Sequence, residues 1–375
     1  MMEEISVLIV DDSAAVRRVY RQLLEDEPGI EVIGAAVDPY DAAAKMRGAL
    51  PDVLLLDIEL PRMDGLTFLA KIMAQKPMPV VICSSHTEAG SEAAMKALER
   101  GACEVIGKPR MATPQAREEA QIRLADAIRA AMHAGRARGY IQRQPRPAKP
   151  PAARPAGKLV SPKLTADAVL PPPHPGRRPP AGLPPLVAIG TSTGGTEALA
   201  EVLPGLPRHA PPVVVVQHMP EHFTATFARR LDAMCAVEVR EAQSGDVPRP
   251  GLVLIAPGDR HMLLQRRGQG YTIEVTDGPY VCRHRPSVDV LLRSVAIAAG
   301  EAAFGIVLTG MGDDGARGLK EMQEAGAATF VQDEATSVVW GMPGEAFRLG
   351  AARRAVPLKN IAGEITQFGN RSRVA

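Results

Sequence analysis

Short apolar runs alternate with longer helix-like stretches along this chain of 375 residues, and the pattern occurs twice. In the first half, the strand candidates are residues 6–10, 53–56, 80–83 and 105–106. In the second half, they are residues 186–189, 213–217, 253–255, 306–309 and 329–332. Because the crossovers are long enough to hold helices, each half is predicted to form an α/β fold, a doubly wound, mainly parallel sheet. Ligands of such folds bind at the carboxyl ends of the strands.

A proline-rich segment separates the two halves. Fourteen of the 34 prolines fall between Pro145 and Pro185, mixed with Arg, Lys and Ala. Such a segment cannot sustain a helix or bury much apolar surface, which is typical of a flexible linker. Before it, residues 117–132 show helical spacing of apolar side chains. The predicted division is a first domain at 1–138, a linker at 139–183 and a second domain at 184–375.

Composition excludes several classes of function. The balance of 44 basic and 42 acidic residues gives a net charge of +2, too small to indicate nucleic-acid binding or attachment to a membrane surface. The four cysteines show no CxxC pairing. The start MMEEISVLIV carries acids rather than a basic n-region, and its apolar run is shorter than a signal peptide or a membrane span needs. We therefore expect a protein of the reducing cytoplasm, without membrane insertion.

Carboxylates follow two of the predicted strands in the first half. Asp11 and Asp12 come after the run VLIV, and Asp57 comes after VLLL. Three carboxylates at one sheet edge repel one another unless a hard divalent cation neutralises them, and Mg²⁺ with its oxygen ligands fits best. An aspartate can also act as a nucleophile toward phosphorus, which gives an aspartyl phosphate.

The next two strands end in groups that bind a phosphoryl oxygen. These are the hydroxyl of Ser84 and the ammonium of Lys108. Residues 4–130 thus resemble a response-regulator receiver domain, which implies a flavodoxin-like fold. The resemblance also implies phosphorylation of Asp57 by a histidine kinase, Mg²⁺ bound by Asp11 and Asp12 with Asp57, and reorientation of Ser84 upon phosphorylation. Val105 departs from the family because an aromatic residue is common there.

The second half opens with a strand that runs into Gly190-Thr191-Ser192-Thr193-Gly194. This matches G-x-S-x-G, a sharp strand-to-helix turn in which small neighbours leave the serine hydroxyl exposed. Alone, the match is weak, since a Ser/Thr/Gly-rich turn can also hold a phosphate at a helix N-terminus.

Two further strands bring partners for the serine. His218 follows the run VVVVQ, while Asp313 and Asp314 lie in a glycine-rich turn after another strand. Ser192 needs a general base such as His218, which in turn needs a carboxylate to fix its tautomer. Periodicity cannot choose between adjacent aspartates. The backbone around Met311, flanked by glycines, is a candidate source of oxyanion donors.

The remaining histidines lack this position at a strand end. We expect solvated or substrate-lining roles for them, although His222, four residues after His218, is predicted to share a helical face with it. A metal site built on this pair has no evident third ligand. The histidines concerned are His209, His222, His261 and His284.

From about residue 186 onward, the segments GTSTGGTEAL, QHMP, APGDRHM, HRPSVDVL and LTGMGDDGARGL closely resemble the catalytic domain of chemotaxis protein-glutamate methylesterases, the CheB family. The resemblance implies that Ser192, His218 and Asp314 form the catalytic set. It implies demethylation of glutamyl methyl esters on chemoreceptors, with deamidation of receptor glutamines. It also implies that the unphosphorylated receiver covers the catalytic edge. Ester hydrolysis is expected to need no cofactor, and a monomer is expected.

Two other functions remain open from the sequence. One is a binding protein whose receiver controls sequestration of a partner by an inert hydrolase-like domain, and the intact serine, histidine and aspartate set argues against it. The other is a transcriptional response regulator. Its output domain requires a basic helix-turn-helix, whereas the second half shows parallel-sheet patterning.

Overall fold

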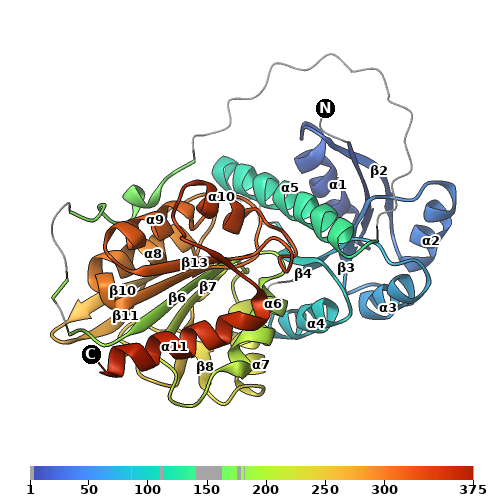
Figure 1. Ribbon diagram of the computed structural model, residues 1–375. Coiled ribbons are helices and arrows are strands. Elements are labelled where there is room, and N and C mark those ends of the chain that lie inside the picture. The colour runs from blue at the N-terminus through green and yellow to red at the C-terminus, as the bar shows by residue number, and fades with distance from the viewer. Residues whose placement is uncertain are drawn as a thin grey trace.

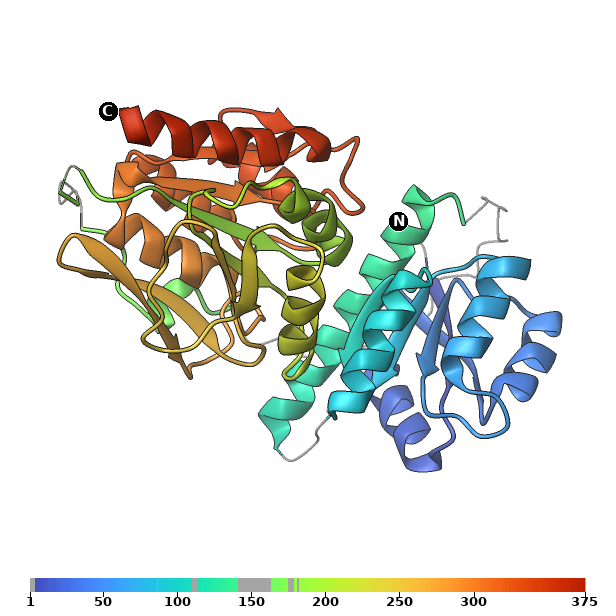
Figure 2. The ribbon, with the colours of Figure 1, turned by 90° about the horizontal axis from the view of Figure 1, so that it is seen from below.

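The computed structural model describes residues 4–85, 87–109, 113–140, 163–174, 179–180 and 182–374. They form two α/β units that lie side by side, and the long helix α5 (Pro114–Ala137) runs along the boundary between them (Figure 1 and Figure 2). Among the described helices, none combines the length and apolar character that crossing a membrane requires.

The N-terminal unit is a parallel sheet of 5 strands in the order β2-β1-β3-β4-β5. Its strands are β1 (Ile5–Val10), β2 (Ile30–Ala36), β3 (Val53–Asp57), β4 (Val80–Ser84) and β5 (Glu104–Gly107). Its first four helices are α1 (Ala14–Leu24), α2 (Pro39–Gly48), α3 (Gly65–Gln75) and α4 (Glu88–Glu99). The four predicted strands are confirmed. β2 was missed because Glu31 and Gly34 interrupt its apolar pattern.

Side-chain caps fix where these helices begin. The residue before each of α1 to α5 accepts a hydrogen bond from a backbone N–H of the first turn, which satisfies a donor that has no partner within the helix. The capping residues are Ser13, Asp38, Asp64, Thr87 and Thr113. Each crossover is thereby held at a defined register against the sheet.

The C-terminal unit is a parallel sheet of 7 strands in the order β14-β13-β12-β6-β7-β9-β8, plus the hairpin β10-β11. Its strands are β6 (Leu186–Thr191), β7 (Val213–Gln217), β8 (Glu238–Glu241), β9 (Leu252–Ile255), β10 (His261–Arg267), β11 (Gly270–Thr276), β12 (Ala303–Val307), β13 (Ala328–Gln332) and β14 (Ala355–Val356). Its helices are α6 (Gly195–Val202), α7 (Phe223–Asp232), α8 (Val288–Ala298), α9 (Ala316–Glu324), α10 (Met342–Arg348) and α11 (Ile361–Val374).

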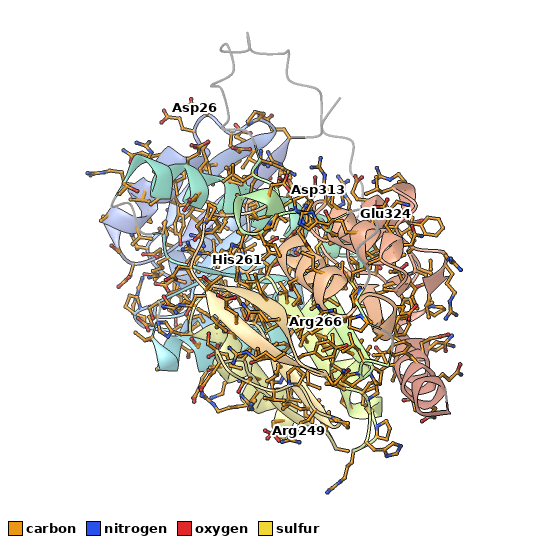
Figure 3. The ribbon with its side chains drawn as sticks, turned by 90° about the vertical axis from the view of Figure 1, so that its left-hand side faces the viewer. Asp26, Arg249, His261, Arg266, Asp313 and Glu324 are labelled. Atoms are coloured by element: carbon orange, nitrogen blue, oxygen red, sulfur yellow. The ribbon has the colours of Figure 1, made fainter. Side chains whose placement is uncertain are left out.

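The five strands predicted here are present, and the sequence missed β8, β14 and the hairpin. The missed strands are short, mixed or antiparallel, whereas β6, β7, β9 and β12 are buried along their whole length. Burial on both faces explains why these central strands read as continuous Val, Leu and Ile. Charged side chains such as Arg249, Arg266 and Glu324 lie on the outside (Figure 3).

Part of the predicted linker packs against the C-terminal unit. The buried Arg293 side chain of α8 pairs with Asp167 at 2.5 Å and with Glu321 at 2.6 Å. Cys282 donates its backbone N–H to the Leu164 carbonyl at 2.9 Å. The stretch from 163 to 170 therefore belongs structurally with the C-terminal unit, and flexibility does not describe it. Residues 141–162 of the predicted linker lie outside the described residues.

Candidate functional site

Ser192 lies in the turn between β6 and α6, where close packing demands small neighbours. Gly194 has a φ of 78°, and a Cβ there would lie 2.6 Å from the Cβ of Val338. At Gly310, a Cβ would lie 2.8 Å from the Cβ of Ser192 itself. Both distances are shorter than any van der Waals contact, so glycine is required at these positions.

His218 follows β7 directly and is tied to the serine turn. Its backbone N–H donates to the Thr191 carbonyl at 3.1 Å. The buried Gln217 amide donates to the carbonyls of Ser192 at 3.0 Å and His218 at 3.1 Å. Gln217 therefore links the two loops, a role that its sequence position at a strand end did not reveal.

Asp314 is buried at the N-terminus of α8. Its carboxylate accepts hydrogen bonds from His218 Nε2 at 2.8 Å, the Ser287 hydroxyl at 2.9 Å and the backbone N–H groups of Val288 at 2.8 Å and Asp289 at 2.9 Å. Burial by itself raises the pKa of Asp314, but the bond to His218 and the other donors lower it below its usual value. Asp314 is thus held as an anion, also favoured by the helix dipole.

The ionised Asp314 determines the state of the His218 ring. A carboxylate only accepts, so Nε2 carries the proton and donates to it. Nδ1 is buried and has no hydrogen-bond partner within the described part of the chain. Nδ1 is therefore the ring nitrogen left to accept a proton.

His284 stacks on His218. Their ring centroids lie 3.7 Å apart and the planes differ by 5°. His284 Nδ1 donates to the Cys282 carbonyl at 2.8 Å. Burial, and then the neighbouring His218, lower the pKa of His284 to about 3, so this ring stays neutral. Sequence reasoning gave His284 no special role, although the quoted segment HRPSVDVL contains it.

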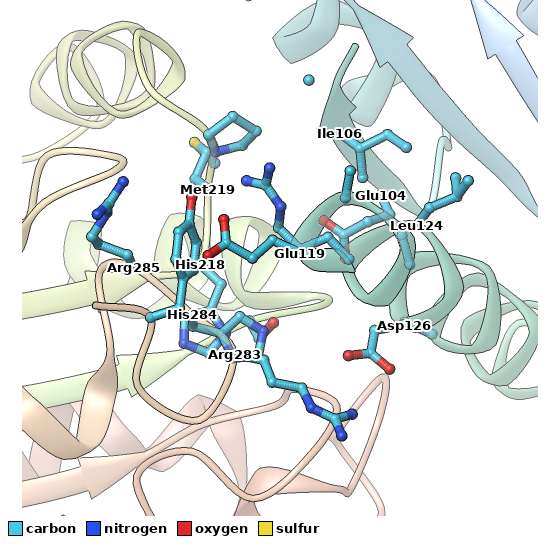
Figure 4. A pocket seen from close by; sticks show the side chains of 18 of the residues that line it. Glu104, Ile106, Glu119, Leu124, Asp126, His218, Met219, Arg283, His284 and Arg285 are labelled. Atoms are coloured by element: carbon cyan, nitrogen blue, oxygen red, sulfur yellow. The ribbon is translucent and has the colours of Figure 1, made fainter. Parts of the chain in front are cut away.

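Ser192, His218 and His284 line one cavity of about 400 Å³. Figure 4 shows the two histidine rings at this cavity. The Ser192 side chain makes no hydrogen bond to other described residues, and it is 9% exposed. The serine is accessible from the cavity while its neighbours are fixed, which is the arrangement that a nucleophile requires.

Two backbone N–H groups at the cavity are candidates for an oxyanion site. The amide of Met311, the sequence candidate, lines the cavity with Thr193, and neither amide donates to another described residue. The Ser192 amide is already used, since it donates to Thr309 at 3.0 Å. The unbonded donors are those that can meet a developing negative charge.

Of the other histidines, His261 is linked to Asp314 through Ser287. His222 is paired with its neighbour Glu221. His261 is buried, with Nε2 donating to the Pro279 carbonyl at 2.9 Å and Nδ1 accepting from Ser287 at 3.2 Å. His222 precedes α7 and is exposed. The prediction that it shares a helical face with His218 is therefore wrong. The turn of the chain between the two residues separates their side chains.

In the N-terminal unit, Asp57, Asp11 and Lys108 meet at the carboxyl edge of the sheet. Lys108 Nζ lies 2.7 Å from Asp57 Oδ2 and 3.2 Å from Asp11 Oδ2. Burial raises the pKa of the Asp57 carboxyl, with Lys108 opposing the shift. The ammonium thus partly neutralises two buried carboxylates, whereas the sequence predicted a phosphoryl oxygen as the partner of Lys108.

The carboxylates of this cluster fit a divalent cation. One oxygen each from Asp11, Asp12 and Asp57 lies within 4.8 Å of the others. Asp11 Oδ2 is buried, and its contact with Lys108 is not aligned as a hydrogen bond. An all-oxygen set with an unsatisfied buried atom and the exposed Asp12 suits Mg²⁺ and its waters.

Ser84 and Val105 are two residues of the N-terminal sheet whose side chains bear on switching. The Ser84 hydroxyl donates to the Gly90 carbonyl at 3.0 Å, so it is engaged with α4. Val105 is buried in the core, where the sequence departs from the aromatic residue common in receivers. The aliphatic side chain at this position leaves no aromatic ring to rotate.

The two units touch through both helices and loops. α4 packs against α7, and the carboxylate of Glu99 lies 2.9 Å from Arg230 Nε. Arg138, at the end of α5, pairs with Glu197 at 2.5 Å. Residues of α5 and β5 also line the cavity that holds Ser192, so the receiver half forms part of the cavity wall.

Fold and site together define a two-domain protein in which a receiver-like unit is joined to a unit that brings Ser192 and the bonded pair His218 and Asp314 to the carboxyl edge of its sheet. The chain belongs to the CheB methylesterase family: residues 187–365 match that family and residues 7–116 match the response regulator receiver domain.

The relatives cover nearly the whole chain. The protein-glutamate methylesterase/protein-glutamine glutaminase 5 of Anaeromyxobacter dehalogenans is 58% identical over 97% of this chain and 96% of the relative. The protein-glutamate methylesterase/protein-glutamine glutaminase 2 of Rhodospirillum rubrum is 57% identical over 99% of this chain and all of the relative. The order of the two domains is therefore shared with these proteins.

Among solved structures, the CheB methylesterase catalytic domain of Thermotoga maritima is similar to the C-terminal unit. It is 35% identical, with a TM-score of 0.48, over 49% of this chain and 98% of that one. The response regulator domain of Thermotoga maritima CheB is 36% identical, with a TM-score of 0.31, over 35% of this chain and 97% of that one.

Proposed function

We propose that this protein is a phosphorylation-controlled serine hydrolase that removes methyl groups from glutamyl methyl esters of chemoreceptors and deamidates receptor glutamines. Relatives with these activities in their names match it over nearly its whole length. The observation that supports the chemistry most strongly is the 2.8 Å bond between His218 and Asp314, in a cavity that Ser192 also lines.

The proposed reaction proceeds by acyl transfer. His218 Nδ1 takes the proton of the Ser192 hydroxyl while the serine oxygen attacks the ester carbonyl carbon. The oxyanion that forms accepts hydrogen bonds from the amides of Met311 and Thr193. The imidazolium then returns its proton to the leaving oxygen, and methanol departs.

Water completes the cycle. His218 deprotonates a water molecule, which attacks the acyl-serine. The imidazolium then returns the proton to the leaving Ser192 oxygen, and the glutamyl carboxylic acid departs and ionises to the carboxylate. A glutamine side chain follows the same path and loses ammonia instead of methanol. Asp314 stabilises the imidazolium at both stages.

The receiver half is proposed to be phosphorylated on Asp57 by a histidine kinase of the chemotaxis pathway. Asp11, Asp12 and Asp57 would hold Mg²⁺, which supplies positive charge against the incoming phosphoryl group. Lys108 and the hydroxyl of Ser84 would contact phosphoryl oxygens, so Ser84 must leave the Gly90 carbonyl.

The unphosphorylated receiver is proposed to inhibit the catalytic half by covering it. α5 and β5 line the cavity of Ser192, which supports a closed state. Reorientation of Ser84 changes its contact with α4, and α4 packs on α7 of the catalytic half. Phosphorylation then shifts the population toward an open enzyme.

The proposed organisation keeps the receiver at 1–138 and the catalytic domain in the remainder after the linker, acting as a cytoplasmic monomer on receptors. An inert sequestering domain is not favoured, because the relatives carry the enzyme names and Ser192, His218 and Asp314 are all present.

A small-molecule phosphodonor with Mg²⁺ is expected to raise methanol release from methylated receptor membranes by about 5- to 150-fold, the usual range of coupling between two sites. Asp57→Asn is expected to abolish the increase while retaining the unstimulated rate, because it removes the nucleophile for phosphate and not the esterase. A chelator is expected to have the same effect on the wild type. Stimulation of Asp57→Asn equal to that of the wild type would show that Asp57 is not the acceptor.

A further inference from the structure

One contact of the receiver reaches the residue beside the catalytic serine. Glu104, the first residue of β5, accepts a hydrogen bond from the hydroxyl of Thr193, with 2.6 Å between Oε2 and Oγ1. Thr193 directly follows Ser192 in the serine turn. Glu104 stands on the receiver side of the cavity, opposite the stacked pair His218 and His284 (Figure 4).

Stability alone does not explain this contact. Burial raises the pKa of the Glu104 carboxyl, with the Thr193 bond opposing the shift. Glu104 makes no ion pair with any described residue, and its other hydrogen bond comes from the Val105 amide at 3.3 Å. The ring of His218 also opposes the shift, but it makes no ion pair with Glu104. Burying a carboxylate without an ion-pair partner is unfavourable, so a hydrophobic residue at this position would hold the interface better.

The chemistry of the group supplies an explanation that rests on the proposed function. The product of the proposed reaction is a glutamyl side-chain carboxylate, and Glu104 offers the same group to the same cavity. We propose that the Thr193 hydroxyl forms the subsite for a carboxyl oxygen of the substrate's glutamyl group, and that Glu104 occupies this subsite in the closed enzyme as an internal product analogue.

Other contacts across the boundary have a different role. The pairs Glu99–Arg230 and Arg138–Glu197 also join the two halves, but none of these four residues lines the Ser192 cavity. They attach the receiver, whereas Glu104 fills the subsite. Glu99→Ala therefore weakens the attachment without emptying the subsite, and it is the matched control for Glu104→Ala.

The first test compares unphosphorylated full-length proteins. The readouts are methanol release from methylated receptor membranes and the rate at which a fluorophosphonate labels Ser192, which needs no receptor. Glu104→Ala is expected to raise both about tenfold or more, within the range of site-to-site coupling. Glu99→Ala is expected to change them by at most roughly threefold, as for an exposed ion pair.

The second test uses a product-like probe, N-acetyl-glutamate α-amide. It is expected to slow fluorophosphonate labelling of Glu104→Ala, in which the subsite is empty, and to leave wild-type labelling unchanged. In the double variant Glu104→Ala/Thr193→Val, the probe concentration needed for the same protection is expected to rise about tenfold or more, since the hydroxyl donor is gone. N-acetyl-leucine amide is the control probe and is expected to protect none of them.

Two outcomes would overturn the inference. One is labelling of Glu104→Ala at the wild-type rate. Glu104→Gln, which keeps an oxygen acceptor of the same shape, serves as the check that variants at this position fold. The other is equal release by Glu104→Ala and Glu99→Ala. Either result leaves the proposed esterase intact if phosphorylated wild type still releases methanol. Absence of methanol release from every protein would instead refute the esterase, while the labelling result stands separately.

Discussion

Asp314→Asn is expected to lower methanol release by about 10⁴-fold, a loss of roughly 5 kcal/mol of transition-state stabilisation. The amide cannot carry the negative charge that supports the His218 imidazolium. In the wild type, the carboxylate accepts hydrogen bonds from the Ser287 hydroxyl and two backbone N–H groups of α8. The amide nitrogen of the variant would face some of these donors and could not accept from them. A flipped amide would leave His218 in the wrong tautomer.

Asp313→Asn is the matched control for this prediction. Asp313 is the adjacent residue, half exposed, and its partner is Lys163 at 2.7 Å rather than a histidine. We expect its methanol release to stay within about threefold of the wild type, as for other exposed ion pairs. A large loss in Asp313→Asn and a small one in Asp314→Asn, measured on proteins with equal thermal midpoints, would reverse the assignment.

His218→Ala is expected to reduce methanol release by about 10³- to 10⁴-fold, because it removes the general base and the acid that protonates the leaving oxygen. The residual activity would come from the backbone donors near Met311 and from substrate binding. The loss should persist in the phosphorylated protein, since opening of the receiver cannot replace the base.

His222→Ala is the control for the histidine prediction. His222 lies four residues away on an exposed turn, and its nearest acid is Glu221 at 3.8 Å. Its replacement is expected to leave the rate of chemistry within about twofold, as for surface substitutions in general. Equal losses for the two histidine variants would point to a disturbed loop after β7 rather than to a missing base.

Residues at strand ends could be predicted from the sequence because parallel sheets place them together. Asp57, Ser84, Ser192 and His218 each end or follow a strand whose apolar run is plain in the sequence. Strand order then brings Asp57 and Ser84 to one edge of the N-terminal sheet, and Ser192 and His218 to one edge of the C-terminal sheet, without any knowledge of side-chain contacts. The same logic failed for β2, whose run is broken by polar and glycine positions.

Contacts between loops could not be predicted in this way. His284 stacks on His218 from a loop 66 positions further along the chain, and Gln217 uses its side chain to clamp two carbonyls. The choice of Asp314 over Asp313 depends on which carboxylate meets the N-terminus of α8. Such details follow from tertiary packing, for which hydrophobic periodicity carries no signal.

The boundary between the domains was the least predictable feature. Glu104 reads in the sequence as an ordinary polar residue at the start of a strand, and its contact with Thr193 spans 89 positions. The linker was interpreted from composition alone, which gave no sign that Asp167 pairs with Arg293. Composition indicates which backbone conformations a segment favours. The contacts of Glu104 and Asp167 depend instead on which side chains the tertiary fold brings next to them.

Methanol release from methylated receptor membranes by the phosphorylated wild type and by phosphorylated Ser192→Ala tests the central claim most directly. The account predicts rapid release by the wild type and a rate at least about 10³-fold lower for the variant, because the variant lacks the hydroxyl that forms the acyl-enzyme. Equal release by the two proteins, or none by either, would contradict the assignment of this chain as a serine esterase acting on receptor glutamyl esters.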